Sequence, residues 1–432
     1  MSTDASDAVP AAGAPAAASL RLTPYSWYVL VVLMMVYAFN WMDRYIFVIL
    51  MEPLKRDLRI SDTALGFLSG FAFSVVYTIA GIPIARWADL RNRVAVVAIG
   101  LTVWSVMTAA CGLARNLTHL AFARVGVGLG EAACSPPSHS VISDYFPQNR
   151  RAVAFAIYGL GIYLGLTAGL VLGGWINELF GWRTAFISLG LPGVALATAL
   201  ALTVREPKRW APGVEGAESL GAVLRFMASL RSFSAYAVGV GLFSFAANGV
   251  NVWSGVLFMR LHEMSSAEAG AWTGYLGGVA GVIGTLGFGY AADRLGRRDP
   301  RWYLWVTCMA AVVLIPATAA LLFGDDAVAI AGYFVGIACA AACLAPTVAI
   351  TQELMPARMR AVSSAVLALG LNFIGIGAGN LAVGMLTDAF TPHLGVQAIQ
   401  LSLSITTLVG GVASMYFILY GASRLLADLG RG

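Results

Sequence analysis

The stretch GYAADRLGRR, residues 289–298, is a charged turn between two long apolar runs. A degraded copy of it, ARWADLRNR, occupies residues 85–93 in the first half of the chain. A second pair of similar segments, DYFPQNRRA at 144–152 and ELMPARMRA at 353–361, has nearly the same separation. Each member of this pair has an acidic residue, a proline, an arginine and an alanine at matching positions. Motifs repeated half a chain apart predict two homologous halves in parallel orientation.

The composition predicts an all-α membrane protein. Of the 432 residues, 59% are hydrophobic and only 11% are charged, which is too few polar residues to cover a soluble protein of this length. About 20 helical residues cross the hydrocarbon core of a bilayer. We therefore expect 12 transmembrane helices in two pseudo-symmetric six-helix bundles. The segments that are apolar enough are Trp27–Leu50, Asp62–Trp87, Val94–Leu113, Thr118–Tyr145, Val153–Asn177, Thr184–Val204, Ser232–Met259, Ala269–Ala292, Trp302–Gly324, Ala327–Gln352, Ala361–Thr387 and Val396–Tyr420.

The polar segments divide the chain into five parts. We expect a disordered tail at 1–22, a first bundle at 23–204, a cytoplasmic linker at 205–231, a second bundle at 232–424 and a C-terminal tail at 425–432.

The basic residues predict the orientation. Most of them fall on the side that holds both termini, which places both termini in the cytoplasm. The scarcity of Lys relative to Arg and the compact loops favour a bacterial inner membrane. The opposite side holds Lys55, Arg56, Arg59, Arg115, Arg183 and Arg260.

Four charged residues interrupt otherwise apolar helices. Asp43 and Arg44 lie in the first predicted helix, and Arg124 and Glu131 lie in the fourth. A charge at the bilayer centre is costly unless it faces a partner or water, so these residues are candidates for function. Antiparallel packing would place Asp43 level with Arg124, where they can pair, with Glu131 about 10 Å deeper on nearly the same helix face. The alternative is a buried ion-pair network that only fixes the two helices against each other.

The GYAADRLGRR loop resembles the signature of the major facilitator superfamily, and together with the repeats the resemblance covers essentially the whole chain. It implies a carrier whose two halves rock around a central substrate site. It also implies that charges at the cytoplasmic end pair across the halves and hold one access state. The copy at 85–93 departs from the signature at Ala85, Leu90 and Asn92, so the lock there is weaker or differently paired. The implied gate residues are Asp89, Arg93, Asp144, Arg151, Asp293, Arg294, Arg297, Glu353 and Arg360.

Two further motifs resemble the Spinster family of lipid carriers. NWMDRY at 40–45 is similar to the Asn-Tyr-Met-Asp-Arg motif of the Spinster first helix, and Arg124 followed by GLGEA at 128–132 is similar to the fourth-helix motif. Organic anion:cation symporters have a similar pattern, while SDYFP at 143–147 favours Spinster. The resemblance implies a lysophospholipid or sphingolipid-like substrate. A symporter of small organic anions and a multidrug efflux carrier are the alternatives.

We expect proton coupling through Asp43 and Glu131. A carboxylate beside an arginine stays ionised, and it binds a proton when the arginine moves to an anionic substrate. Since the intramembrane charges lie in the first half, the second half would supply a mostly apolar wall with a few hydrogen-bonding groups. The candidate substrate-binding residues are Arg44, Arg124, Asn40, Asn248, Asn251, Trp253 and Asn372.

The remaining features bear on packing and on what to exclude. Gly161, Gly165, Gly169 and Gly173 have the four-residue spacing that permits close helix packing. The sequence has no Walker loop, Gly-x-Ser-x-Gly elbow or His/Cys metal cluster, so we expect no enzyme, no metal site and no cofactor. The expected partners are an amphipathic or organic-anion substrate, protons and membrane lipids, without nucleic acid. We expect a monomer.

Overall fold

A computed structural model describes residues 22–208, 220–356 and 358–430 of the chain. The regular secondary structure of these residues is helical throughout. The first half of the chain contains α1 (Pro24–Ile49), α2 (Met51–Leu58), α3 (Asp62–Gly66), the π-helix η1 (Phe67–Phe71), α4 (Ala72–Leu90), α5 (Arg93–Cys111), α6 (Leu117–Glu131), α7 (Ser135–Tyr145) and α8 (Gln148–Thr203).

In the described residues of the second half, three short π- or 3₁₀-helices lie between longer α-helices. Its elements are α9 (Leu220–Ser229), α10 (Arg231–Leu261), α11 (Ser266–Gly296), α12 (Trp302–Phe323), α13 (Asp326–Ala340), the 3₁₀-helix η2 (Ala341–Cys343), α14 (Leu344–Leu354), α15 (Arg360–Gly370), the π-helix η3 (Leu371–Ala378), α16 (Gly379–Leu394), the 3₁₀-helix η4 (Gly395–Gln397) and α17 (Ala398–Leu429).

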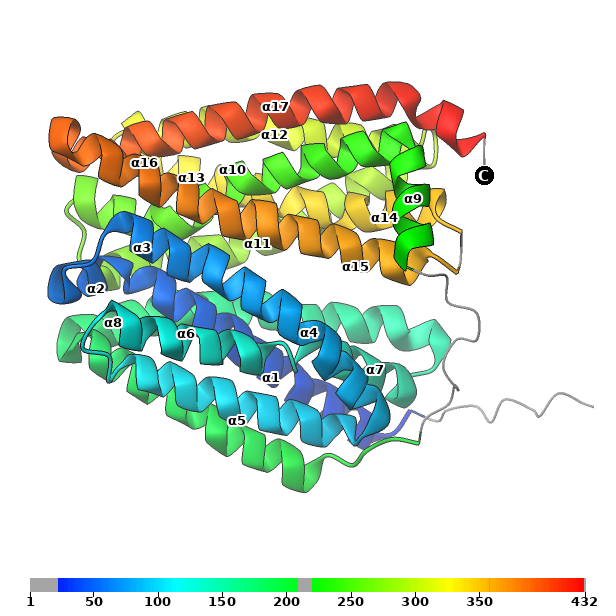
Figure 1. Cartoon of the computed structure of the whole chain (residues 1–432), viewed down its shortest axis with the longest axis horizontal. Helices are drawn as coiled ribbons and strands as arrows, with labels where there is room; N and C mark the ends of the chain where they lie inside the picture. Colours follow the sequence, from blue (N-terminus) through cyan, green and yellow to red (C-terminus); the bar gives the residue numbers. More distant parts are fainter. Residues whose placement is uncertain (1–21, 209–219, 357, 431–432) are drawn as a thin grey trace, which may run out of the picture.

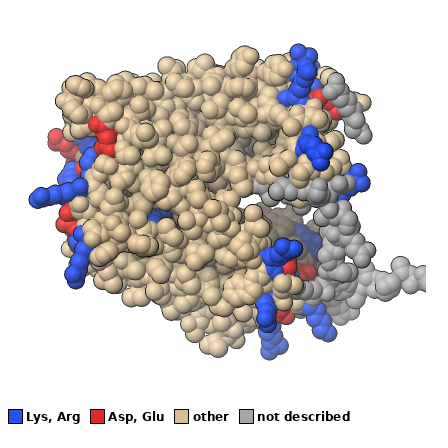
Figure 2. Space-filling view, viewed as in Figure 1, with Lys and Arg blue, Asp and Glu red and all other residues tan. Residues whose placement is uncertain are grey.

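The long helices run roughly along one axis and form two groups, which Figure 1 shows one above the other. The lower group is the first half of the chain and the upper group is the second half. We call the end that holds Pro24 and Leu429 the terminal end, and the opposite end, which holds α2 and α3, the distal end (Figure 1). Lys, Arg, Asp and Glu gather at these two ends on the face shown in Figure 2 and are sparse between them. This distribution is the one expected for helices that cross a bilayer.

Nine helical segments of the described residues are long and apolar enough to span a membrane. Two of them, 148–203 and 362–429, are 56 and 68 residues long, far more than the about 20 residues that one crossing needs. Gly181 (φ 82°, ψ 162°) interrupts the first of these, and Gly395 (φ 56°) interrupts the second. Glycine adopts positive φ without steric penalty, so the chain can turn at both positions. The prediction of an all-helical membrane protein is confirmed.

Short polar side chains begin many of the helices. The Thr23 hydroxyl accepts a hydrogen bond from the Ser26 amide at the start of α1, and Asn116 caps α6 in the same way. Ser265 and Glu268 form a reciprocal capping box at the start of α11. Such caps satisfy amide groups that have no partner within the helix, which fixes where each helix begins.

The predicted helix 118–145 is broken in two. α6 ends at Glu131 and α7 begins at Ser135, with Pro136 and Pro137 in its first turn. Proline has no amide hydrogen to continue a helix, but it fits the first turn of a new one. The break makes Glu131 the last residue of α6 and places its carboxylate at a discontinuity inside the bundle.

The ends of the predicted domains differ from the helices observed. α9 lies within the predicted linker 205–231, and α17 extends through Leu429, beyond the predicted boundary at 424. Residues 1–21 of the predicted tail, 209–219 of the linker and 431–432 of the C-terminal tail lie outside the described residues.

Glycines bring backbones together within and between the halves. Within the first half, a Cβ atom at Gly165 would collide with the Ala38 carbonyl oxygen of α1, so the glycine stripe serves the close packing predicted for it. Between the halves, a Cβ atom at Gly174 of α8 would collide with the Ser266 carbonyl oxygen of α11. We call this contact of α8 with α11 the glycine seam. A second contact between the halves joins α3 and η1 to η3 and α16.

Candidate functional site

The four intramembrane charges meet in the interior of the first half. Asp43 and Glu131 are fully buried, and Arg124 is 2% exposed. The Arg44 side chain, 17% exposed, forms an ion pair in which its Nε lies 2.7 Å from Glu131 Oε2. The four residues therefore form a single charged centre between α1 and α6.

The predicted ion pair between Asp43 and Arg124 is not formed. Neither carboxylate oxygen of Asp43 has a hydrogen-bond partner among the described residues, and the same holds for Arg124 Nε. Asp43 and Arg44 are consecutive on α1, so their side chains point about 100° apart around the helix. The structure turns Arg44 toward the Glu131 carboxylate, and Asp43 remains buried without a cation bonded to it.

Aromatic rings surround both arginines. The Arg44 guanidinium lies 4.5 Å from the ring centroid of Phe73 and 4.9 Å from that of Trp41. The Arg124 guanidinium lies 4.6 Å from the ring centroid of Phe47. Aromatic faces attract cations, most strongly where water is excluded, so they hold the arginines in place without occupying their N–H donors. The guanidinium donors other than Arg44 Nε, which bonds Glu131, stay available for an anion.

Two small cavities adjoin Arg44. One has a volume of about 170 Å³ and the other of about 50 Å³, and Trp41, Arg44 and Phe73 line both. Most of the predicted substrate-binding residues face them: Asn40 and Asn372 line the larger cavity, and Arg124, Asn248 and Asn251 line the smaller one.

Trp253 is placed differently from its prediction. It is fully buried, and its indole Nε1 donates a hydrogen bond to the Asn380 carbonyl oxygen at 3.2 Å. It therefore holds the start of α16 against α10. Within the described residues, no group of three or more His, Cys, Asp or Glu side chains is placed to bind a metal ion.

Arg93 and Arg151 at the terminal end bond to residues of the first half and to Glu206, which follows it. Arg93 is 3% exposed and lies 2.6 Å from both Asp144 and Glu206. The guanidinium Nε of Arg151 donates to the Phe146 carbonyl oxygen at 3.1 Å. These contacts tie together α5, α7, α8 and the residues that follow α8.

The repeated motif makes the same contact in the second half. Arg360 Nε donates to the Met355 carbonyl oxygen at 3.0 Å, as Arg151 does to Phe146. Arg294 donates to the Tyr290 hydroxyl at 2.8 Å on its own helix. The pairing of Asp89, Asp293, Arg297 and Glu353 across the halves stays a prediction.

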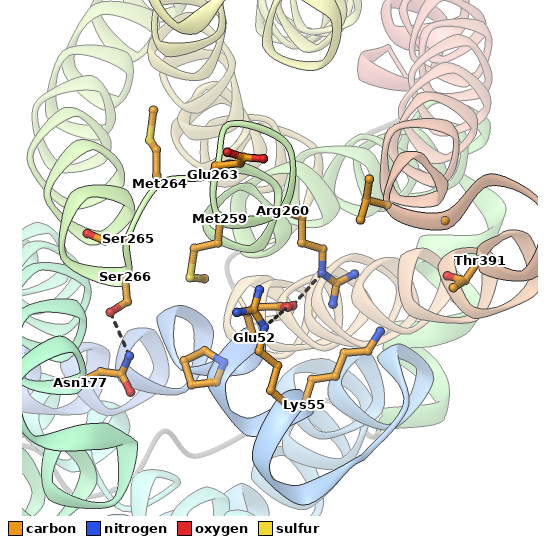
Figure 3. Close-up of a pocket in the computed structure, with 14 residues that line it drawn as sticks. Glu52, Lys55, Asn177, Met259, Arg260, Glu263, Met264, Ser265, Ser266 and Thr391 are labelled. Atoms are coloured by element: carbon orange, nitrogen blue, oxygen red, sulfur yellow. Dashed lines mark hydrogen bonds and ion pairs between the residues drawn. The ribbon is translucent and has the colours of Figure 1, made fainter.

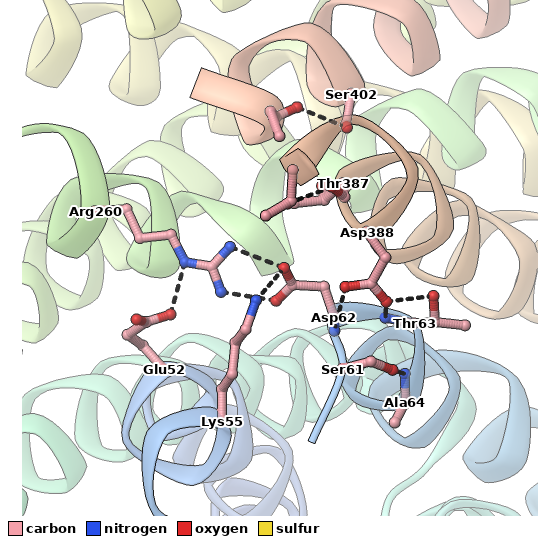
Figure 4. Close-up of polar contacts among 12 residues, drawn as sticks. Glu52, Lys55, Ser61, Asp62, Thr63, Ala64, Arg260, Thr387, Asp388 and Ser402 are labelled. Carbon is pink, nitrogen blue, oxygen red and sulfur yellow. Dashed lines mark hydrogen bonds and ion pairs between the residues drawn. The ribbon is translucent and has the colours of Figure 1, made fainter. Parts of the chain in front are cut away.

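The distal end carries an ion-pair cluster that sequence reasoning missed. Arg260 of α10 lies 2.7 Å from Glu52 of α2 and 2.7 Å from Asp62 of α3 (Figure 4). Lys55 Nζ lies 2.5 Å from the same Asp62 carboxylate, which is fully buried. We call Glu52, Lys55, Asp62 and Arg260 the distal cluster. Because Arg260 belongs to the second half and its partners to the first, the cluster holds the halves together.

A second bond between the halves lies beside the distal cluster. The Asp388 carboxylate of α16 accepts hydrogen bonds from the Asp62 amide at 3.0 Å, the Thr63 amide at 2.7 Å and the Thr63 hydroxyl at 2.6 Å (Figure 4). A carboxylate at a helix N-terminus satisfies amides that have no partner within the helix. Ser61 caps the Ala64 amide from within the first half, and Asp388 satisfies the first two amides of α3 from the other half of the chain.

A large cavity adjoins the distal cluster. It has a volume of about 880 Å³ and is lined by residues of both halves, including Glu52, Lys55 and Asn177 of the first and Arg260 and Glu263 of the second (Figure 3). Asn177 donates to the Ser266 hydroxyl at 2.8 Å at its edge. At the other end of the molecule, Figure 2 shows a hollow between the halves. The distal cluster thus joins the halves at one end, and the hollow lies between them at the other.

One sequence signal could have found the distal cluster. Arg260 is the single basic residue that the predicted topology assigns to the distal side of the second half. Acidic residues lie on the same side in the first half, at Glu52, Asp57 and Asp62. A single basic residue on the same side as several acidic residues of the other half indicates pairing across the halves. Its position in a predicted loop does not by itself show whether it forms an ion pair or is solvated.

Comparison with known proteins identifies the family. The chain is 37% identical to an MFS-type efflux pump of Mycolicibacterium smegmatis over 379 residues, 87% of each chain. It is 30% identical to a probable galactarate/D-glucarate transporter of Bacillus subtilis over 46% of this chain and 44% of that one. It is 25% identical to a sphingosine-1-phosphate transporter of Danio rerio over 60% of this chain and 56% of that one.

Solved structures agree with these relatives. A bacterial homologue of the human lysosomal transporter Spinster, in an inward-facing and unoccupied conformation, superposes with a TM-score of 0.80 at 26% identity. The match covers 94% of this chain and 98% of that one. The model of the Major Facilitator Superfamily matches residues 33–380. This chain belongs to the Major Facilitator Superfamily of transporters and is not an enzyme.

Proposed function

We propose that this protein is a proton-coupled secondary transporter that moves an amphipathic organic anion by alternating access. The observation that carries the proposal is the charged centre, where the buried Asp43 carboxylate forms no ion pair among the described residues and lies beside the ion pair of Arg44 with Glu131. A buried carboxylate that forms no ion pair is costly as an anion, and binding a proton removes that cost. An anionic substrate that binds Arg44 would break its ion pair with Glu131, which would then also be a buried carboxylate without an ion pair.

The proposed architecture is two pseudo-symmetric bundles of six helices. Two of the nine candidate spans are long enough for two crossings each, and α6 with α7 together form one more, which is compatible with 12 helices. The matching contacts of Arg151 and Arg360 support the internal repeat. We place the terminal end in the cytoplasm of a bacterial inner membrane, because most basic residues lie there. The distal cluster then closes the outer side.

A lysophospholipid or sphingolipid-like substrate is our first candidate. Its anionic group would bind Arg44 and Arg124, and its apolar tail would occupy the space between the halves at the terminal end. The likeness to the Spinster homologue over 94% of the chain and to the sphingosine-1-phosphate transporter supports this choice.

A small organic acid is the second candidate. The two cavities at Arg44, of about 170 and 50 Å³, are of a size for a headgroup or a small acid rather than for a whole lipid. The match to the galactarate/D-glucarate transporter favours the same reading. Efflux of amphipathic compounds is a third candidate, which the match to the efflux pump favours.

Proton movement in proteoliposomes tests the proposal. Purified protein is reconstituted with a pH-sensitive dye inside the vesicles and is given a lysophospholipid or a small organic acid. We expect proton movement with the lysophospholipid, and we expect Asp43→Asn to abolish it. Asp57→Asn, which removes an exposed carboxylate at the distal end, is the matched control. Proton movement with the small acid alone would support the second candidate, and undiminished movement in Asp43→Asn would remove Asp43 from the mechanism.

A further inference from the structure

Asn380 is a buried amide that forms none of its possible hydrogen bonds. The residue is fully buried near the start of α16, directly after the π-helix η3. Neither its Oδ1 nor its Nδ2 has a hydrogen-bond partner among the described residues. The side chain lines the smaller of the two cavities at Arg44. Buried polar groups nearly always have partners, so an amide left unpaired at a cavity wall points to a ligand.

Close contacts hold the backbone of Asn380 in place. A Cβ atom at Gly66 would collide with the Asn380 carbonyl oxygen, and one at Gly70 would lie 3.0 Å from Asn380 Cβ. The first half of the chain therefore presses directly on this residue. On its other side, the Trp253 indole holds the Asn380 carbonyl oxygen. The backbone of Asn380 is fixed from two directions while its amide stays unpaired.

A second amide of the same half faces the same cavity. Asn251 Nδ2 donates to the Tyr45 hydroxyl at 2.9 Å, and Asn251 Oδ1 is buried without a partner. Arg44 and Arg124 of the first half line the same cavity. The cavity thus combines cationic donors from the first half with neutral donors and acceptors from the second.

We infer that Asn380, assisted by Asn251, is a specificity-determining residue that binds a hydroxyl or carbonyl group next to the anionic group of the substrate. This inference rests on the proposed function, since it assumes that the anion binds Arg44 and Arg124. An amide both donates and accepts hydrogen bonds, so it can bind a hydroxyl or an ester carbonyl. It forms no hydrogen bond with a plain alkyl chain. The ligand class is an organic anion with a hydroxylated or acylated neighbouring carbon, either in a lysolipid headgroup or in a small hydroxy acid.

Matched ligands test the inference. Isothermal titration calorimetry in detergent compares lysophosphatidic acid with an alkyl phosphate of equal chain length, and gluconate with hexanoate. A site with a buried hydrogen-bonding group rejects an analogue that lacks the matching group. We expect the wild-type protein to bind the hydroxylated member of one pair about 10-fold more tightly. The pair that shows this preference identifies the source of the ligand.

The variant Asn380→Leu has nearly the same size and no polar atoms. We expect it to reduce the preference within the pair to less than about twofold while it changes the affinity for the plain anion by less than about threefold. Asn380→Ala, which also has no polar side-chain atom, gives the same test if Asn380→Leu does not yield monodisperse protein. The control is Thr387→Val on the same helix, because the buried Thr387 hydroxyl already donates to the Val383 carbonyl oxygen at 2.7 Å. This control should keep the wild-type preference.

The outcomes separate failure of the inference from failure of the function. A preference that persists in Asn380→Leu, or an equal loss of affinity for both members of the pair, overturns the role of Asn380 and leaves the proposed transporter of anions standing. No binding of any of the four anions by the wild-type protein overturns the proposed function and the inference with it.

Discussion

Buried ion pairs at the two ends of the molecule join different parts of the chain. At the distal end, Arg260 and Asp388 of the second half bond to Asp62 and Thr63 of the first half. At the terminal end, Arg93 bonds to Asp144 and Glu206, which belong to its own half or directly follow it.

This difference indicates what each set of charges controls. A bond between the halves must break when the halves separate, so it contributes to the free-energy difference between the access states. A bond within one half survives that movement and contributes only to the stability of the half. We therefore expect variants of the distal cluster and of Asp388 to shift the access state, and variants of the ion pairs of Arg93 to lower stability.

The largest effect is expected for Arg260→Ala. It leaves the buried Asp62 with Lys55 alone and removes a partner of Glu52. Removing one member of a buried ion pair costs about 3 kcal/mol or more, which is a shift of more than about 100-fold in the ratio of closed to open distal ends. Spin labels at the exposed Leu113 and Val396 would report this as a longer distance.

Arg260→Lys separates charge from geometry in the same measurement. Lysine keeps the charge but lacks the fork that reaches two carboxylates, so we expect an intermediate shift. A distance distribution that stays at the wild-type value in Arg260→Ala would show that the distal cluster does not hold the closed state.

A smaller shift is expected for Asp388→Asn. The amide still has an oxygen that can accept, but it loses the charge that strengthens three hydrogen bonds to Asp62 and Thr63. We expect the closed state to lose about 1–2 kcal/mol, or about 10-fold in population. The same label pair measures it. A shift as large as that of Arg260→Ala would contradict the prediction that Arg260 stabilises the closed state more than Asp388 does.

The terminal end should respond to Glu206→Gln without a change of access state. The variant weakens the bond to Arg93 and the cap on the Val94 amide. Because Glu206 is 22% exposed at the side chain, we expect a loss of about 1 kcal/mol in stability, seen as a lower melting temperature in detergent. A longer distance between the labels at Leu113 and Val396 would show instead that this end also controls access.

The smallest effect is expected for Asp57→Asn. The hydrogen bond from Arg183 lowers the pKa of Asp57, but both side chains are 47% exposed, so solvent screens the pair. We expect a loss of less than about 0.5 kcal/mol. A lowered pKa gives stability that is present above the unfolded value of about 3.9 and is lost as the pH falls through the folded value.

The pH dependence provides the check on this variant. Melting temperatures of the wild-type protein and Asp57→Asn should differ by a constant amount from pH 7 to pH 5, and the difference should shrink below about pH 4. A difference that instead grows as the pH falls would mean that the charge of Asp57 is unfavourable in the folded protein.

The sequence predicted which helices carry the charged centre but not which charges pair. Intramembrane charges stand out in apolar segments, so Asp43, Arg44, Arg124 and Glu131 could be found at once. Residue spacing gives depth along a helix to within a turn. It does not give the rotation of one helix against another, and a rotation of one residue exchanges Asp43 for Arg44 as the group that faces α6.

The helical membrane fold could be predicted from the apolar segments, because each is much longer than an apolar stretch that arises by chance. The break between Glu131 and Ser135 was missed, since α6 and α7 read as one apolar segment, although Pro136 and Pro137 mark a boundary. Asn380 was passed over for Asn372 because both are single amides in an apolar helix. Its full burial, its unpaired amide and its packing against Gly66 and Gly70 set Asn380 apart, and these appear only in the structure.

The glycine seam between α8 and α11 has a consequence for how relatives of this protein can diverge. A side chain at Gly174 or Gly270 would collide with a backbone oxygen of the facing helix, which no rotamer change can relieve. A substitution of either glycine therefore needs a compensating shift of a whole helix. We expect single substitutions at these two positions to be selected against. The distal cluster is built from side chains, so one pair there can replace another. We expect relatives to vary the side chains of the distal cluster more freely than the glycines of the seam.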